Sequence, residues 1–262
     1  MSESAAAEPR TFARRDVHTE EPSLAGKRIL ITGGTTGIGR AVAALLGSCG
    51  ARTFIFGRHA PELRDALEHI RAAGGAAEGV IADQAGADDI DKVFSAVDEA
   101  LGGLDVAIIN AGLGSEPLSQ AAEARWRYVV ETNLTGAIAV AQEAAKRLEG
   151  RDGQGQIVLV GSISADAEGE GSPAYAATKG GIRSFARSLR NELAKKGVRV
   201  SLIEPGTVGT DMIEDGPAEQ RARIGGHQML RAEDIAVAIR YVVSQPPRCD
   251  VTSLRIEPRL QG

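Results

Sequence analysis

Tyr175 and Lys179 are the two residues whose types and spacing best suit proton transfer. They stand four positions apart in a stretch with helical periodicity, so their side chains are expected on one face of a helix. A lysine ammonium beside a phenol favours the phenolate and lowers the phenol pKa from about 10, which lets a tyrosine give or take a proton near neutral pH. Such pairs also decorate solvated helix surfaces, so this pair alone does not establish a site.

Ser162 is a third candidate for chemistry. It follows the apolar run at 157–160, which predicts a short buried strand, and its hydroxyl could polarise a carbonyl group. In a doubly wound fold the carboxyl ends of the strands form the ligand-binding edge. A serine at the end of a strand is common without any such role, so a structural serine is the alternative.

A glycine-rich turn near the start of the chain could bind a phosphate group. The apolar run 29–31 predicts a strand, four glycines follow within residues 33–39, and an apolar helical pattern comes next. This turn would direct backbone N–H groups and the positive end of a helix at a diphosphate. Gly33 permits the tight turn, Gly37 allows close approach of the ligand, and Gly39 lets the helix lie on the strand. The spacing, Gly-x-x-x-Gly-x-Gly, differs from the common Gly-x-Gly-x-x-Gly fingerprint, so a purely structural turn is the alternative.

Alternating strand and helix patterns position these residues. Strands are predicted at 29–31, 52–56, 76–82, 106–109, 157–160, 198–203 and 254–256, and helices at 61–73, about 90–97, 121–149, 174–195 and 233–243. This order predicts an α/β fold, a Rossmann-type doubly wound parallel sheet of about seven strands with helices on both faces. Residues 207–230 show no regular pattern, and because a loop of that length is unusual, we expect a functional lid there.

Composition limits the class of protein. A chain of 262 residues with 43% hydrophobic residues fits one α/β domain, predicted over residues 24–262, after a disordered acidic extension at 1–23 that has no signal-peptide core. The net charge of −5 comes from interspersed charges, which argues against nucleic acid, and no apolar run approaches the ~20 residues of a membrane helix. Cys49 and Cys249 lie far apart without metal-ligand spacing, so we expect reduced thiols, no metal and a cytoplasmic protein.

Several motifs together carry a resemblance to one family. They are Thr32-Gly33-x-x-x-Gly37-x-Gly39, Asn110-Ala111-Gly112, Asn133, Ser162, Tyr175-x-x-x-Lys179 and Pro205-Gly206-x-x-x-Thr210. In order and spacing they resemble the short-chain dehydrogenase/reductase family, over about residues 24–256. The resemblance implies an oxidoreductase that interconverts a secondary alcohol and a carbonyl with a nicotinamide cofactor.

The resemblance also implies a role for each motif residue. Tyr175 would be the general acid in reduction and the base in oxidation, and Lys179 would hold the nicotinamide ribose and lower the Tyr175 pKa. Ser162 would hydrogen-bond the substrate oxygen; Ser164 competes with it, but only Ser162 keeps the family's distance to Tyr175. Asn133 would hold a water in the proton relay, although a local helix kink or cap is its alternative, because asparagine is a poor mid-helix residue.

The residues expected to bind the dinucleotide come from the glycine turn and from the ends of several strands. Asn110 would form scaffold hydrogen bonds beside the cofactor, Thr210 would meet the carboxamide, and Asp83 would contact adenine, with ordinary turn or loop roles as alternatives. The full set is Gly33, Thr35, Thr36, Gly37, Ile38, Gly39, Arg58, His59, Asp83, Gln84, Asn110, Ala111, Gly112, Tyr175, Lys179, Pro205, Gly206, Val208 and Thr210.

The end of the second strand indicates which cofactor is preferred. NAD enzymes place an acidic residue there for the ribose 2′-OH, whereas an arginine accommodates the 2′-phosphate of NADP. Gly57 stands at that position and Arg58 follows, with His59 or Thr36 able to assist. We therefore expect NADP(H) to be preferred, with NAD(H) possible; a solvated surface arginine is the alternative.

The sequence departs from the family pattern at a few places. Ile109 replaces an asparagine frequently seen before Asn-Ala-Gly, and Thr36 stands where many NADP-dependent members carry a basic residue. The segment 251–258 lacks a glycine-rich ending and resembles the branch that includes 3-hydroxy acid and serine dehydrogenases. We therefore expect a small-molecule substrate, a hydroxy acid or another small polar alcohol, or alternatively a 3-oxoacyl thioester.

Charged residues near the expected pocket leave substrate recognition open. The lid carries Arg221, Arg223, His227 and Arg231, and the loop after Ser162 carries Asp166, Glu168 and Glu170. The favoured interpretation is that these charged side chains are simply solvated. The alternative is that an arginine of the lid binds an anionic substrate. Trp126 is expected in helix packing.

Two other classes of protein compete with an active enzyme. A catalytically inactive dinucleotide sensor has no need of serine, tyrosine and lysine together, and a glycine-rich methyltransferase predicts neither this pair nor Arg58. By resemblance we also expect a homo-oligomer, a tetramer, with an interface formed by the long helices around Asn133 and Tyr175.

Overall fold

The fold is described by a computed structural model for residues 22–150, 153–166, 172–213 and 215–261. The predicted N-terminal extension falls mainly on residues 1–21, outside the described residues, as do Glu168 and Glu170.

Seven parallel strands form the central sheet of the described chain, in the order β3-β2-β1-β4-β5-β6-β9. β4 and β5 are fully buried, and so is β1 after its first residue, because their apolar runs are covered on both faces, as parallel sheets require. The predicted fold class is therefore confirmed. The strands are β1 (Arg28–Thr32), β2 (Arg52–Gly57), β3 (Ala76–Ile81), β4 (Val106–Ile109), β5 (Gly155–Val160), β6 (Val198–Pro205) and β9 (Ser253–Ile256).

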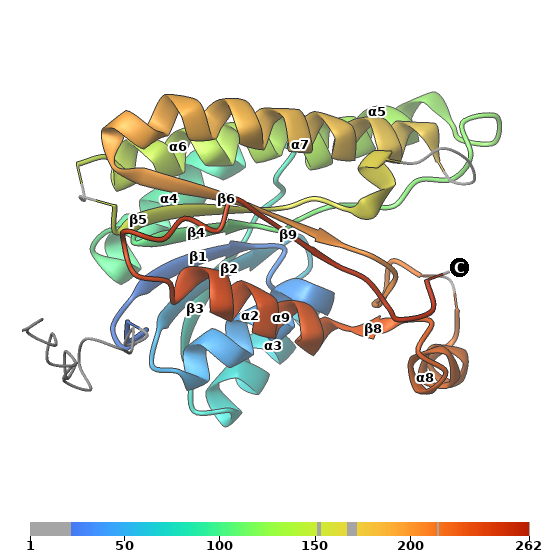
Figure 1. Ribbon diagram of the computed structural model, residues 1–262, viewed down its shortest axis with the longest axis horizontal. Coiled ribbons are helices and arrows are strands. Elements are labelled where there is room, and N and C mark those ends of the chain that lie inside the picture. The colour runs from blue at the N-terminus through green and yellow to red at the C-terminus, as the bar shows by residue number, and fades with distance from the viewer. Residues whose placement is uncertain (1–21, 151–152, 167–171, 214, 262) are drawn as a thin grey trace, which may run out of the picture.

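Helices cover both faces of the sheet (Figure 1). One layer contains α4 (Ala87–Leu101), α5 (Glu123–Val130), α6 (Ala137–Leu148) and α7 (Pro173–Leu193); the other contains α2 (Gly37–Ser48), α3 (Ala60–Ala72) and α9 (Ala232–Val243). Each layer has its own core. The first core includes Phe94 and Ile182, and the second includes Leu46 and Ile239. The helices form because their apolar residues recur at helical spacing and bury one stripe against the sheet.

The segment predicted to be irregular, residues 207–230, is more regular than expected. It contains β7 (Val208–Gly209) and α8 (Pro217–Gly225), and β7 pairs in parallel with β8 (Leu230–Arg231). The prediction of no regular structure was therefore wrong. Pro217 begins the helix, but none of its residues is buried, so no apolar stripe marks it in the sequence.

The predicted long helix at 121–149 is interrupted by a π-helical turn. The segment η1 (Glu131–Gly136) joins α5 to α6 without a loop. Such turns widen a helix by one residue and are frequent at functional sites. Gly136 is required there, because a Cβ at this position would lie 2.2 Å from the carbonyl oxygen of Gln84.

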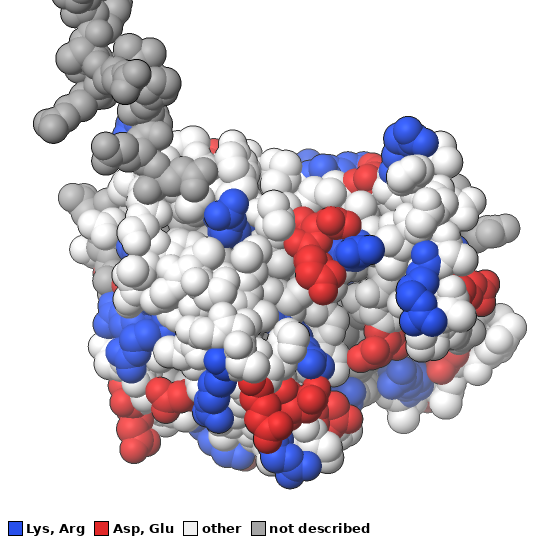
Figure 2. Space-filling model, turned by 90° about the horizontal axis from the view of Figure 1, so that it is seen from below, with Lys and Arg blue, Asp and Glu red and all other residues white. Residues whose placement is uncertain are grey.

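The outer face formed by α2, α3 and α9 carries mixed charges. Figure 2 shows basic and acidic side chains interspersed on this face, with no extended basic patch in view. Among the described residues, no helix is both long and apolar enough to span a membrane.

Candidate active site

The predicted site residues converge on one cavity of about 1210 Å³. It lies beyond the carboxyl ends of the strands, around β1 and β4, where the strand order reverses and doubly wound folds bind their ligands. All the predicted catalytic and dinucleotide-binding residues line it except Gly39 and Asn133, which lie behind its wall.

The glycine turn has the geometry needed to hold a phosphate. Gly33 and Gly37 have φ of 62° and 51°, a region that L side chains rarely adopt. A Cβ on Gly39 would lie 2.2 Å from the carbonyl oxygen of Gly33, so only glycine lets α2 begin this close to the turn. Thr36, the N-cap of α2, makes no side-chain cap bond, which leaves the first N–H groups of the helix for a ligand.

Thr32 and Asn110 join β1 to the end of β4. The Thr32 hydroxyl accepts the N–H groups of Asn110 and Ala111 at 3.1 and 2.8 Å. The Asn110 amide donates back to the carbonyl oxygens of Thr32 and Gly33 at 3.1 and 3.3 Å. The predicted scaffold role of Asn110 agrees with this geometry. No role was predicted for Thr32, although it belongs to the glycine motif.

Tyr175 and Lys179 share one face of α7. Pro173 opens this helix, and Ser172 caps it by accepting the N–H of Tyr175 at 3.4 Å. Lys179 is 5% exposed, and its Nζ donates to the carbonyl oxygen of Val160 at 3.1 Å and lies 5.5 Å from the centre of the Tyr175 ring. A lysine has three donors, so this ammonium, anchored to the end of β5, can also bind a ligand in the cavity.

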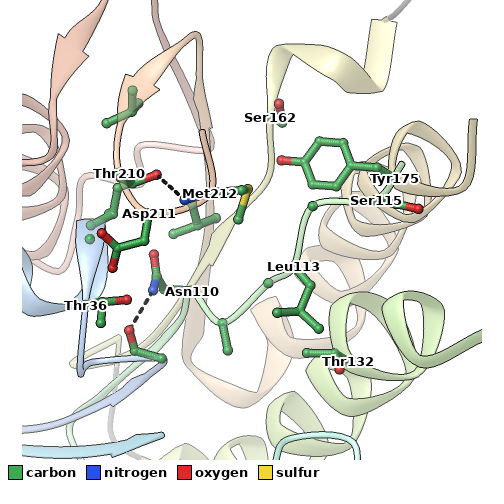
Figure 3. Close-up of a pocket in the computed structure, with 18 of the residues that line it drawn as sticks. Thr36, Asn110, Leu113, Ser115, Thr132, Ser162, Tyr175, Thr210, Asp211 and Met212 are labelled. Carbon is green, nitrogen blue, oxygen red and sulfur yellow. Dashed lines mark hydrogen bonds between the residues drawn. The ribbon is translucent and has the colours of Figure 1, made fainter. Parts of the chain in front are cut away.

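Ser162 lies two residues beyond β5 and faces the cavity together with Tyr175. In Figure 3 both side chains stand on one side of the cavity, with Thr210 and Met212 on the opposite side. The Ser162 hydroxyl donates to the hydroxyl of Ser164 at 3.1 Å and accepts its backbone N–H at the same distance. Both serines line the cavity, so the structure brings the two competing candidates together.

Asn133 lies in the π-helical turn and holds the loop after β4. Its amide accepts the N–H of Leu113 at 2.7 Å and donates to the carbonyl oxygen of Leu113 at 2.9 Å. It also donates to the hydroxyl of Thr178 on α7 at 3.3 Å. A Cβ on Gly112 would lie 3.5 Å from both Asn133 Oδ1 and Lys179 Nζ, so Asn133 lies close to two residues that line the cavity. The π-helical turn agrees with the alternative that Asn133 marks a local irregularity of the helix, and its place in a proton relay stays a prediction.

Arg58, Tyr128 and Asp83 form a hydrogen-bonded chain beyond the ends of β2 and β3. Arg58 donates from Nη1 to the Tyr128 hydroxyl at 2.6 Å, and that hydroxyl donates to the Asp83 carboxylate at 2.5 Å. Burial, and then the hydrogen bond to Asp83, raise the pKa of the Tyr128 phenol, so it is protonated at neutral pH. No role for Tyr128 could be predicted from the sequence, because its two partners stand 45 and 70 residues away in the chain.

Gln84, three residues beyond β3, joins this wall of the cavity to the π-helical turn. Its side chain donates to the backbone oxygen of Thr132 at 2.8 Å, and both residues line the cavity. Gln84 Oε1 and Thr132 Oγ1 are themselves buried and have no hydrogen-bond partner among the described residues.

The substrate end of the cavity is formed by residues 113–117, by 210–213 and by Gln261. Gln261 accepts the N–H of Thr207 at 3.1 Å and donates to its hydroxyl at 3.1 Å, which fixes the start of the lid segment. Neither Gln261 nor Met212 was predicted. Arg221, Arg223, His227 and Arg231 do not line this cavity, and neither does Trp126. Arg223 forms an ion pair with Asp215, so it is not simply solvated.

An ion-pair network fixes the loop that carries the two serines. Arg183 on α7 donates to Glu204 at 2.6 Å and to Asp166, the last residue of η2 (Ile163–Asp166), and Arg255 donates to Asp166 at 2.8 Å. These hydrogen bonds, first that from Arg183, hold the pKa of the Asp166 carboxyl below its ordinary value. The network ties the serine loop to the helix that carries Tyr175.

Several known proteins are similar to this chain in sequence and in fold. The family model for short chain dehydrogenase matches residues 27–221. The chain is 32% identical to the 3-oxoacyl-[acyl-carrier-protein] reductase MabA of Mycobacterium tuberculosis over 233 residues, which cover 86% of this chain and 88% of that protein. It is 32% identical to a serine 3-dehydrogenase of Agrobacterium fabrum over 236 residues, covering 88% and 93%. A solved short chain dehydrogenase from Burkholderia cenocepacia, in complex with NADP, matches with a TM-score of 0.80 and 32% identity over 90% of this chain and 98% of its own.

Proposed function

This chain belongs to the short chain dehydrogenase family of oxidoreductases, and we propose that it uses NADP(H) to interconvert a secondary alcohol and a carbonyl compound. The observation that supports this best is that Tyr175, Lys179 and Ser162 line the same cavity as the glycine turn. A sensor that only binds a dinucleotide would need the turn but has no need of serine, tyrosine and lysine together.

We infer that the glycine turn binds the dinucleotide. A Cβ on Gly39, Gly33 or Gly37 would lie within about 3.3 Å of other atoms of this chain, so these glycines let the turn pack closely on its neighbours. We infer that the free N–H groups of α2 hold the diphosphate and that Lys179 binds the nicotinamide ribose. When bound, the nicotinamide supplies or accepts the hydride.

The side chains of this protein would handle the proton and the substrate oxygen. Tyr175 would give its phenolic proton to the oxygen during reduction and take it back during oxidation. Ser162 would donate a hydrogen bond to the same oxygen and hold it toward Tyr175. Lys179 is buried beside the Tyr175 ring, where its ammonium could bind the cofactor, and Asn133 would keep the loop at Leu113 in place and hold a relay water.

We propose a hydroxy acid or another small polar alcohol as the substrate, with a 3-oxoacyl thioester as the alternative. Relatives at the same level of identity are named for both kinds of reaction, a serine 3-dehydrogenase and a 3-oxoacyl reductase. The test is a panel of 3-oxo acids, simple ketones and 3-oxoacyl thioesters, with the matching alcohols for the reverse direction. Turnover is followed by the near-ultraviolet absorbance of NADPH. No turnover with tight NADPH binding would support the inactive sensor instead.

Arg58→Ala should raise the KM for NADPH and leave NADH kinetics nearly unchanged. The guanidinium offers parallel donors to a 2′-phosphate, and because the side chain is exposed the effect should stay near the low end of charged hydrogen bonds. We expect wild type to prefer NADPH by about ten- to a hundredfold, measured as kcat/KM for both cofactors. Arg64→Ala removes the same charge from the exposed side of α3 and is the matched control. Equal use of both cofactors by wild type, or equal loss for both in Arg58→Ala, would refute the preference.

A reciprocal variant tests Gly57. An aspartate there would bind the NAD ribose and repel a 2′-phosphate. A Cβ on Gly57 would lie 2.6 Å from the Thr35 hydroxyl oxygen, so the aspartate needs space that Thr35 fills. Thr35→Ala/Gly57→Asp, compared with Thr35→Ala alone, should therefore move the preference toward NADH.

We also propose that the protein assembles as a homotetramer through the long helices around Asn133 and Tyr175. Ile138 on α6 is 39% exposed and would be covered in such an interface. Light scattering should give about four times the 27.3 kDa mass of one chain, and monomers alone would refute the assembly. A cytoplasmic location stays a prediction from the sequence.

A further inference from the structure

Tyr128 connects two charged residues that line the cavity, although it does not line the cavity itself. Its hydroxyl accepts from Arg58 Nη1 at 2.6 Å and donates to Asp83 Oδ2 at 2.5 Å, and the Arg58 guanidinium carbon lies 5.4 Å from the centre of its ring. Arg58 and Asp83 line the cavity, whereas Tyr128 is not among its lining residues. Any effect of Tyr128 on a ligand would therefore pass through its two partners.

The contact restricts a side chain that is otherwise free to move. Arg58 follows the last residue of β2 and is exposed, and an unrestrained arginine loses rotamer entropy when it is fixed. The ring and hydroxyl of Tyr128 hold the guanidinium before any ligand arrives, using one of its five donors. The remaining donors are available for a phosphate.

The phenol also keeps opposite charges from pairing directly. If Arg58 bonded straight to Asp83, the carboxylate would neutralise the cation that a phosphate needs. Tyr128 accepts from the cation and donates to the carboxylate, so each charge has a partner and the neutral hydroxyl separates them. Asp83 is held independently, because it accepts the N–H of Ala85 at 2.9 Å.

We propose that Tyr128 is a positioning residue for Arg58 and thereby strengthens the preference for a ligand with a phosphate on the adenosine 2′ position. This role of Tyr128 rests on the proposed preference for NADP(H), which Tyr128 would strengthen.

The test measures binding of two fragments to the full-length protein by calorimetry: adenosine 2′,5′-bisphosphate and adenosine 5′-monophosphate, which differ by the 2′-phosphate. Tyr128→Phe should raise the Kd of the bisphosphate about three- to tenfold, the size of one net hydrogen bond, and leave the Kd of the monophosphate unchanged. Tyr241→Phe deletes the same hydroxyl from the exposed face of α9, where the side chain is 50% exposed, and should change neither value. With NADPH, Tyr128→Phe should raise KM and leave kcat unchanged.

The outcomes separate this inference from the cofactor proposal. If Tyr128→Phe weakens both fragments equally or weakens neither, Tyr128 does not position Arg58 for the 2′-phosphate. In an Arg58→Ala background, Tyr128→Phe should have no further effect on the bisphosphate, and an additional loss would show a route that bypasses Arg58. If wild type binds both fragments equally and Arg58→Ala changes nothing, the NADP(H) preference itself fails. If Arg58→Ala weakens the bisphosphate and Tyr128→Phe does not, only the role of Tyr128 fails.

Discussion

Tyr175→Phe should lower kcat by about 10²- to 10⁴-fold, the usual contribution of general acid–base catalysis, and leave the Kd for NADPH nearly unchanged. The substitution removes the hydroxyl that would exchange a proton with the substrate oxygen. It keeps the ring that lies 5.5 Å from Lys179 Nζ, so the walls of the cavity stay in place. Single-turnover kinetics and a separate NADPH titration measure the two quantities.

Two controls make this result specific. Tyr241→Phe removes an exposed hydroxyl outside the cavity and should retain full activity. Ser162→Ala should lower kcat less than Tyr175→Phe, because it removes a hydrogen bond to the oxygen but not the proton donor. Substantial residual turnover in Tyr175→Phe would contradict the assignment of Tyr175. A loss of NADPH binding as large as the loss of rate would indicate a structural tyrosine.

Gly39→Ala should destabilise the protein by about 3 kcal/mol, roughly 6–12 °C in Tm for a domain of this size, and weaken NADPH binding strongly. In an ordinary helix the same change stabilises. Here the added Cβ would lie 2.2 Å from the carbonyl oxygen of Gly33 and 2.7 Å from the Asn110 amide nitrogen. The collision is with backbone, so α2 must move away from the turn that would hold the diphosphate.

Gly225→Ala is the matched control for this substitution. Gly225 is the last residue of α8, outside the helices of the proposed interface, and a Cβ there would meet nothing within 4 Å. We expect no loss of stability, because alanine restricts the unfolded chain and favours the helix. Thermal unfolding of both variants gives the comparison. A Gly39→Ala protein with unchanged Tm would show that the turn tolerates a side chain.

The parts of the fold that the sequence predicted are those with a local signal. Buried runs such as 29–31 and 157–160 gave the strands, and helical spacing of Ile90, Val93 and Phe94 gave a helix. The helix α8 was missed because it buries none of its residues. Hydrophobic periodicity reports burial, and an exposed helix has none to report.

Site residues could be predicted where they stand at a fixed, short spacing in the sequence. They could not be predicted where the residues in contact lie far apart in the sequence. Tyr175 and Lys179 could be placed together because they stand one helical turn apart. The Tyr128 hydroxyl meets Asp83 and Arg58 only because α5 packs beside the ends of β2 and β3. Gln261 reaches Thr207 from 54 residues away for a similar reason.

The π-helical turn sets the rotational phase between two halves of one helix. One extra residue rotates α5 by about 100° relative to α6, compared with an uninterrupted α-helix. With this offset α6 buries Val140 and Ala144 in the core while Tyr128, on α5, meets Asp83. Asn133, at the turn itself, reaches Leu113. The side of α5 that faces the cavity and the side of α6 that faces the core are therefore oriented separately. The contacts of Tyr128 and Asn133 depend on the number of residues between 131 and 136 as much as on the identity of those residues.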